Sequence, residues 1–404
     1  MYNNSKALLE ILKSFLFETE YKKPVDLDID NIIKIAELHS VTAMVGAVFE
    51  KAGVEISPLM QTVILKRKIQ CATLGAQREL FFNEISRGLT ENGIENIIVK
   101  GYVLRELYPI RDLRTMTDMD FVIKSNDGTK MEKVMDELGY ELGEVFQGDW
   151  SFFKNKMHIE FHEKLTESEL GNGFNYDEYL RDCFEHTVEY NGLTKTLDKE
   201  YHLIYMFIHC AKHFYNGGCG FRMIMDFAAY LKAYNNAIDW RYINGELKKI
   251  KLYDFSKNIW YLCGEWFGIT AENKVFSIDI SLYNEVFGFI AKGGTFGEAE
   301  GEERMISKVA RESIEKSSCN AMTSLWIKLR RYIFLNDESM RGIIPWYKNK
   351  PKMMLPAAWI YKGITAINKK GLSITKDIII SGASDEKAIK EYNMLKGLGL
   401  YKKK

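Results

Sequence analysis

Two aspartates, Asp118 and Asp120, stand one residue apart in an apolar segment that continues through Phe121, Val122 and Ile123. A β-strand alternates its side chains between two faces, so both carboxylates are expected to project from the same face. Carboxylates that close repel each other unless a cation lies between them. Mg²⁺ is such a cation, because it binds hard carboxylate oxygens together with water and phosphate oxygens. The pair therefore predicts a metal site, with the polar edge of an ordinary strand as the alternative.

A third carboxylate occurs in a second alternating segment, Met157–His162. In a strand over these residues, Glu160 shares a face with two histidines. If this strand lies beside the first one, the three acids meet and can hold two metal ions of the kind used in phosphoryl transfer. We therefore predict that Asp118, Asp120 and Glu160 bind Mg²⁺ or Mn²⁺ and act in catalysis. A solvated strand position is the alternative for Glu160.

Upstream of the aspartates, the apolar segment Ile94–Val99 ends in Lys100-Gly101, where a short helix is expected to begin. Backbone amides at a helix start, a glycine that permits close approach and an adjacent lysine suit a phosphate group. Arg114 is a further candidate for offsetting phosphate charge, with an ordinary loop position as the alternative. These three residues predict binding of a nucleotide, and with the acids they predict transfer of a nucleoside monophosphate from a nucleoside triphosphate.

The composition sets limits on the class of protein. The chain has 404 residues with 55 basic and 55 acidic side chains, so its charge does not favour nucleic acid as the main partner. Its six cysteines show no paired spacing, which favours a reduced protein and hence a cytoplasmic location. The sequence shows neither the plan of a signal peptide nor the roughly 18 consecutive apolar residues of a membrane span.

The elements that must position these residues predict an α+β fold. Helical spacing dominates the N-terminal part, short strands mixed with helices follow, and the signal is then helical again. The tail mixes bulky apolar and basic residues, which indicates a packed bundle or, alternatively, a segment near a membrane surface. The predicted parts are an N-terminal helical segment (1–90), a small mixed-sheet catalytic core (91–197), a helical domain lining the substrate (198–295) and a basic-aromatic helical tail (296–404).

The order of these motifs resembles a known family, the bacterial uncharacterised nucleotidyltransferases of the polymerase-β-type superfamily. The resemblance covers roughly residues 90–235 and is carried by Lys100-Gly101, Tyr108-Pro109, Arg114-Thr115-Met116-Thr117-Asp118-Met119-Asp120 and Glu160-Phe161-His162. It implies a nucleoside triphosphate and Mg²⁺ as substrate and cofactor. The acceptor stays open among small molecules, sugars, peptides and proteins, as does the oligomeric state. Tyr102 follows Gly101 where the superfamily usually has Gly-Ser or Gly-Gly, which weakens the phosphate assignment of this turn.

Two further predictions rest on the resemblance. The helix over residues 201–214 would line the nucleotide, with Lys212 or His213 reaching the phosphates; a core helix with hydrogen-bonded histidines is the alternative. Asp226 would act as the general base for an acceptor hydroxyl, or would instead pair with Arg222 one helical turn away. Transfer of the γ-phosphate, or a non-catalytic scaffold that keeps the fold, are the alternatives to nucleotidyl transfer.

Overall fold

The chain forms two compact units, Met1–Glu298 with Leu398–Lys404 and Ala299–Gly397. Every residue of the predicted site lies in the first unit. The structure is a computed structural model, and it describes residues 2–24, 27–146, 148–166, 170–295, 311, 314, 334, 337, 340–341, 344–348, 350–362, 364–365 and 386–402.

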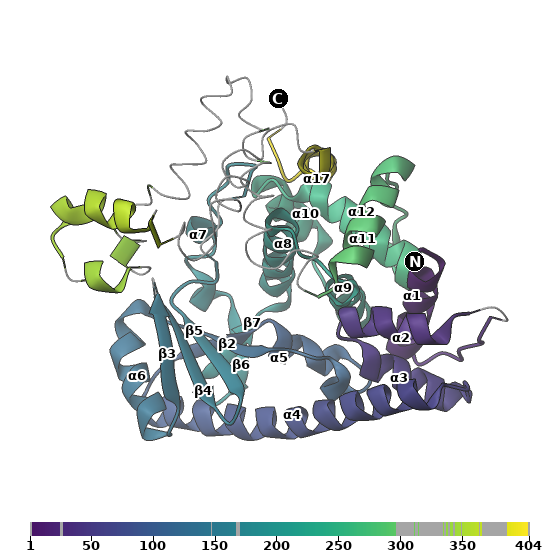
Figure 1. Cartoon of the computed structure of the whole chain (residues 1–404), viewed down its shortest axis with the longest axis horizontal. Coiled ribbons are helices and arrows are strands. Elements are labelled where there is room, and N and C mark those ends of the chain that lie inside the picture. The colour runs from purple at the N-terminus through teal and green to yellow at the C-terminus, as the bar shows by residue number, and fades with distance from the viewer. Residues whose placement is uncertain are drawn as a thin grey trace. The chain divides into compact units, whose positions relative to one another are not determined.

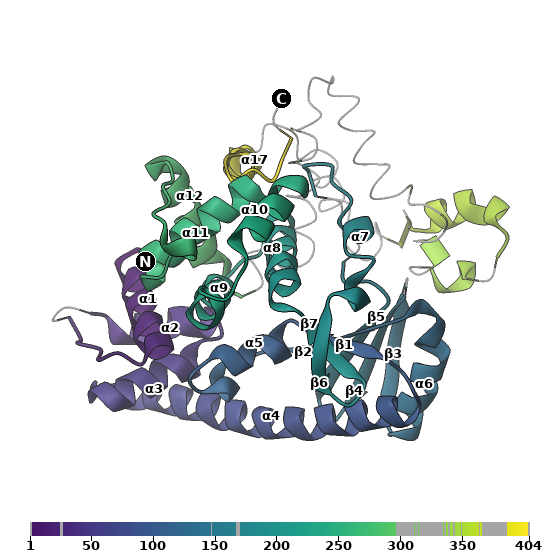
Figure 2. The same cartoon turned by 180° about the vertical axis from the view of Figure 1, so that it is seen from behind.

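Four helices begin the first unit: α1 (Tyr2–Phe17), α2 (Ile29–Leu38), α3 (Thr42–Ala52) and α4 (Pro58–Glu91). Apolar residues at helical spacing, such as Ile32, Ile33 and Ala36 of α2, are completely buried. Asp28 caps α2 by accepting a hydrogen bond from the Asn31 backbone N–H at 3.0 Å. α4 has 34 residues and extends from the other N-terminal helices along the sheet (Figures 1 and 2).

A seven-stranded mixed sheet follows, in the spatial order β3-β4-β5-β2-β1-β7-β6. The pairs β2–β5 and β1–β7 are parallel, whereas the other neighbours are antiparallel. The strands are β1 (Asn96–Val99), β2 (Asp118–Ile123), β3 (Glu141–Phe146), β4 (Asp149–Lys154), β5 (Met157–His162), β6 (Thr187–Asn191) and β7 (Thr194–Leu197).

One face of this sheet is apolar and is covered by helices. Met119 and Phe121 of β2 point to this face, where they join one buried cluster with residues of α4 and of α6 (Gly128–Glu137). Phe121 stacks on Phe161 of β5 with ring centroids 5.1 Å apart. Because side chains alternate along a strand, burying these residues forces Asp118 and Asp120 onto the opposite face.

The later helices gather on the side of the sheet away from α4 (Figures 1 and 2). The Asp198 carboxylate caps α8, and α8 ends at Gly217, whose φ of 90° lies in the left-handed region that favours glycine. Every helix in the described part of the chain is too short or too polar to cross a lipid bilayer. The later helices that gather on this side of the sheet are α8 (Lys199–Asn216), α9 (Phe221–Tyr234), α10 (Trp240–Lys249), α11 (Tyr253–Phe267) and α12 (Ile280–Gly293).

The N-terminal helices are tied to the segment that precedes β2. Arg78 of α4 donates a hydrogen bond to the Met116 carbonyl at 2.6 Å. The Thr115 hydroxyl donates to the carbonyl of Ser40, between α2 and α3, at 2.9 Å. These contacts fix the backbone immediately before Asp118.

The predicted α+β fold is confirmed, with N-terminal helices, a mixed sheet and C-terminal helices. The two strands β6 and β7 were not predicted. In the second unit the structure describes α17 (Glu386–Gly397) and a small apolar cluster of Met340, Ile344, Tyr347 and Ala358. Most of the predicted helical tail, including residues 296–310 and 366–385, lies outside the described residues, and the three boundaries between the four predicted parts stay predictions.

Candidate metal and phosphate site

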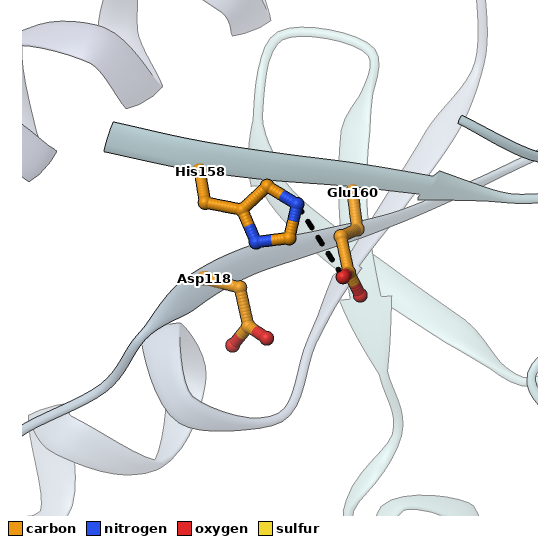
Figure 3. Close-up of side chains that lie close together, drawn as sticks. All are labelled: Asp118, His158 and Glu160. Atoms are coloured by element: carbon orange, nitrogen blue, oxygen red, sulfur yellow. Dashed lines mark ion pairs between the residues drawn. The ribbon is translucent and has the colours of Figure 1, made fainter. Parts of the chain in front are cut away.

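The parallel pairing of β2 with β5 brings the three predicted acids together. In this register Asp118 lies opposite His158 and Asp120 lies opposite Glu160. Figure 3 shows Asp118 on β2 next to the two side chains of β5, all on one face of the sheet. Because His162 follows two residues after Glu160, it shares this face as well. Two adjacent strands thus supply a continuous polar surface of carboxylates and imidazoles.

The possible ligand atoms on this surface fall into two groups that share Glu160. Asp118, His158 and Glu160 form one group, and Asp120, Glu160 and His162 form the other. Within each group the ligand atoms all lie within 4.8 Å of one another. His158 Nε2 is 3.5 Å from Glu160 Oε1, the ion pair marked in Figure 3. A carboxylate shared between two groups is the arrangement expected for a pair of metal ions.

Asp120 is the most buried of the three acids, with 2% of its surface exposed. Lys100 forms an ion pair with it, and His162 Nε2 lies 3.1 Å from its Oδ1. Burial alone would raise the pKa of Asp120, but the charges and hydrogen bonds of these two partners outweigh burial and hold that pKa below its usual range. Asp120 is therefore a carboxylate at neutral pH.

His162 connects Asp120 to a fourth carboxylate. Its Nδ1 lies 2.7 Å from Asp149 of β4, which pairs with β5 in antiparallel register at this position. Burial would lower the pKa of His162, but its bonds to Asp120, Asp149 and Glu160 raise the pKa to about 10. The protonated ring donates from both nitrogens and holds the orientation of Asp120, and it would have to lose a proton before it could bind a metal ion.

Asp118 has the opposite electrostatic environment. No ion pair to Asp118 occurs among the described residues. Burial and the nearby charge of Asp120 raise the pKa of Asp118 above its ordinary value, although Lys100 opposes the shift. A cation bound between the aspartates would remove this repulsion.

The turn between β1 and the helix α5 (Gly101–Leu104) has a strained backbone at Lys100. Its φ is 56° and its ψ is −130°, a conformation that side-chain-bearing residues rarely adopt. Lys100 Nζ is thereby directed to Asp120. Gly101 packs closely, since a Cβ there would lie 2.7 Å from Arg114 Nη1. The glycine thus has a packing reason, and its predicted phosphate contact stays a prediction.

Arg114 and Asp226 form a buried ion pair. Arg114 donates from Nη2 to Asp226 Oδ2 at 2.7 Å and from Nε to Oδ1 at 3.0 Å. The Tyr108 hydroxyl donates to the same Oδ1 at 2.7 Å. The expected pair between Asp226 and Arg222 is wrong, because the carboxylate turns to Arg114 and Arg222 instead donates to Thr115. The base role of Asp226 stays a prediction, but both of its oxygens are already engaged.

Helix α8 presents a row of polar side chains to the site. His209 and His213 lie one turn apart with their Nε2 atoms 3.1 Å from each other. Burial lowers the pKa of both rings, for His213 to about 4, so they are neutral at pH 7. His202 Nε2 and the Tyr205 hydroxyl are buried on the same helix without a hydrogen-bond partner among the described residues. Buried polar atoms of this kind ordinarily have a partner, and a ligand or water can supply it.

A cavity of about 220 Å³ joins the sheet to these helices. Of the predicted residues, it brings together seven. Glu160 lies beside the aspartates on the sheet rather than on the cavity wall, and Lys212, on α8, is also outside the wall. The seven are Lys100, Gly101, Arg114, Asp118, Asp120, His213 and Asp226.

Residues 26–268 match the sequence profile of a family described as uncharacterised nucleotidyltransferases. The match covers more than half of the chain. The chain belongs to this family. Neither the curated proteins nor the solved structures contain a match.

The uncharacterised nucleotidyltransferase match includes α2–α11, and with them every candidate residue of the site. Sequence reasoning missed two residues that the structure places there, Asp149 and Tyr205, and it gave Arg222 a different partner. The hairpin β4–β5 carried a signal for Asp149, since antiparallel register puts it opposite His162. Tyr205 carried one too, because it lies four residues before His209 on the same helical face. Arg222 was assigned to Asp226, and no local signal pointed to Thr115.

Proposed function

We propose that this protein transfers a nucleoside monophosphate from a nucleoside triphosphate to an acceptor hydroxyl or phosphate and releases pyrophosphate, with Mg²⁺ or Mn²⁺ as cofactor. The observation that carries the proposal is the in-register pairing of β2 and β5. It sets Asp118, Asp120 and Glu160 side by side, and it sets the two aspartates at a cavity that also holds cationic side chains. A nucleotidyltransferase family supports the reaction class.

The residues fit a hard divalent cation. Carboxylate oxygens are the ligands that Mg²⁺ and Mn²⁺ prefer, and those of Glu160 are shared between the two groups of ligand atoms. Asp118 and Asp120 would hold both ions, and Glu160 would hold the one nearer the acceptor. Such ions supply charge neutralisation at the attacking and leaving oxygens.

The chain's own side chains would bind and orient the triphosphate. Lys100 keeps Asp120 ionised and stands at the turn next to Gly101, where the β- and γ-phosphates would lie. Arg114, held by its ion pair with Asp226, packs against Gly101 and so stabilises that turn. His213 is neutral and can contribute a hydrogen bond rather than a charge.

Two alternatives give different products. If the γ-phosphorus is attacked, the same residues would release a nucleoside diphosphate. A scaffold that only keeps the fold would release neither product. Assays for pyrophosphate and for nucleoside diphosphate therefore separate the three cases. A screen of sugar phosphates, small hydroxyl compounds, peptides and proteins with labelled nucleotides would identify the acceptor.

Calorimetry tests the metal assignment directly. Nucleoside triphosphate is titrated into the protein with and without Mg²⁺, and the titration is repeated with Asp118→Asn and Asp120→Asn. We expect the Mg²⁺-dependent part of the affinity to be lost in both variants. Asp136→Asn, an exposed position on α6, is the matched control and should behave as the original protein. Equal Mg²⁺-dependent affinity in all four proteins would refute the assignment.

A further inference from the structure

The cavity wall carries equal numbers of cationic and carboxylate side chains, but not all of them form ion pairs with one another. Two cation–carboxylate pairs form, Lys100 with Asp120 and Arg114 with Asp226. One carboxylate and one cation are left without an ion pair among the described residues. The three cations are Lys100, Arg114 and Arg222, and the three carboxylates are Asp118, Asp120 and Asp226.

Arg222 has unused hydrogen-bond donors. A guanidinium carries five N–H groups on three nitrogens. Both hydrogen bonds of Arg222 leave from Nη1 and end on Thr115, one of them on the backbone carbonyl at 2.8 Å. In the part of the chain that the structure describes, Nε and Nη2 have no acceptor, and the side chain lines the cavity. The edge of the guanidinium formed by Nε and Nη2 can donate two parallel hydrogen bonds to two oxygens of one anion.

The surroundings of Arg222 do not stabilise its charge. Burial and the guanidinium of Arg114 lower the pKa of Arg222 to about 10, and the opposing effects of Asp226, Tyr108 and Asp118 are smaller. Arg222 is half-buried, and a charge that is partly removed from water without a counterion is costly, so it is usually found where a ligand supplies the opposite charge. Asp118 is the complementary case, a carboxylate on the same cavity wall without an ion pair among the described residues.

We infer that Arg222 binds the β- and γ-phosphates of the nucleoside triphosphate from helix α9. The identity of the ligand rests on the proposed function, whereas the anion site itself rests on the geometry. A phosphate chain would give both Arg222 and Asp118 a partner. Its oxygens can accept from the guanidinium, and it binds together with a divalent cation that the aspartates can hold. Arg222 would then be the residue that recognises the leaving pyrophosphate.

A purely structural role for Arg222 makes a different prediction. Its contact with Thr115 lies three residues before Asp118, so losing it would also disturb the aspartates. In that case divalent-cation binding would fall together with anion binding. An anion site predicts that anion binding alone falls.

The test measures three ligands separately by calorimetry: inorganic pyrophosphate, Mn²⁺ alone and an unphosphorylated nucleoside. For Arg222→Gln we expect pyrophosphate affinity to fall by at least about tenfold, the loss typical of a hydrogen bond to a charged group. Mn²⁺ and nucleoside affinities should stay within about twofold of the original. Arg222→Lys keeps the charge but loses the two parallel donors of the guanidinium, so its pyrophosphate affinity should also fall, though by less, which keeps the test valid if Arg222→Gln does not fold. Arg111→Gln, an exposed arginine outside the cavity, is the control.

Three outcomes would overturn the inference: no pyrophosphate binding by the original protein, an unchanged pyrophosphate affinity in Arg222→Gln, or a parallel loss of pyrophosphate and Mn²⁺ binding. Failure of nucleotidyl transfer alone is a separate result. It would remove the proposed reaction while leaving the pyrophosphate measurement to decide the anion site.

Discussion

Replacing Asp226 with Asn is expected to lower the free energy of unfolding of the first unit by about 3–5 kcal/mol. Both partners of the Arg114–Asp226 pair are 6% exposed, so solvent screens the interaction little. The substitution removes the negative charge opposite Arg114 and replaces one accepting oxygen with a donating amide. The 2.7 Å bond from Arg114 Nη2 is then lost, and the guanidinium remains buried without a counterion.

Thermal unfolding measures this effect. For a unit of this size the expected loss corresponds to a fall in Tm of about 5–8 °C. The double variant Arg114→Met/Asp226→Leu should recover much of the stability, because it removes both charges together. Asp136→Asn should leave Tm unchanged. An Asp226→Asn protein with an unaltered Tm and no turnover would refute the reasoning and assign Asp226 to the general base instead.

Two other predictions concern the stability of the first unit. His39 is fully buried, accepts from the Phe221 N–H and faces the Ala291 carbonyl, and burial lowers its pKa to about 4. Because the unfolded state binds the proton more tightly between pH 6.5 and 4, stability should fall by about 3 kcal/mol as the pH drops through this window. Denaturant unfolding of the original protein and of His39→Gln would show it, and equal pH slopes would contradict it. At Gly46 in α3 a Cβ would lie 2.2 Å from Ile64 Cγ2, so Gly46→Val should cost about 1–3 kcal/mol, partly restored by Ile64→Ala. An unchanged unfolding midpoint for Gly46→Val would show that α3 and α4 can move apart.

The sequence predicted correctly those features of the site that follow from the alternation of side chains along a single strand. Alternation along a strand placed Asp118 and Asp120 on one face, and an apolar neighbour such as Phe121 showed which face is buried. The adjacency of Glu160 needed one assumption about strand order, and β2 and β5 do pair. These inferences depend on one or two strands at a time, so they needed no knowledge of the distant chain.

The rest of the site depends on contacts between residues far apart in the chain. Arg114 and Asp226 are 112 positions apart, and their pairing is decided by where α9 packs. The local rule for helices predicted Arg222 as the partner because it considers only one turn. Lys212 and His213 are neighbours in sequence, but only His213 lines the cavity, which depends on the rotation of α8 about its axis.

The bonds from Arg78 to Met116 and from Thr115 to Ser40 bear on what could be separated from this protein. α4 would span about 50 Å as one continuous helix, and it contributes to the core beneath the sheet as well as to the packing of α3. The seven-stranded sheet is therefore not expected to fold as an independent domain without α4. A shortened chain that starts at β1 would expose the apolar face of the sheet and release the backbone before Asp118. The smallest fragment expected to keep this site therefore includes the N-terminal helices. Insertions should be better tolerated at exposed turns, such as the one around Lys156, than anywhere along α4.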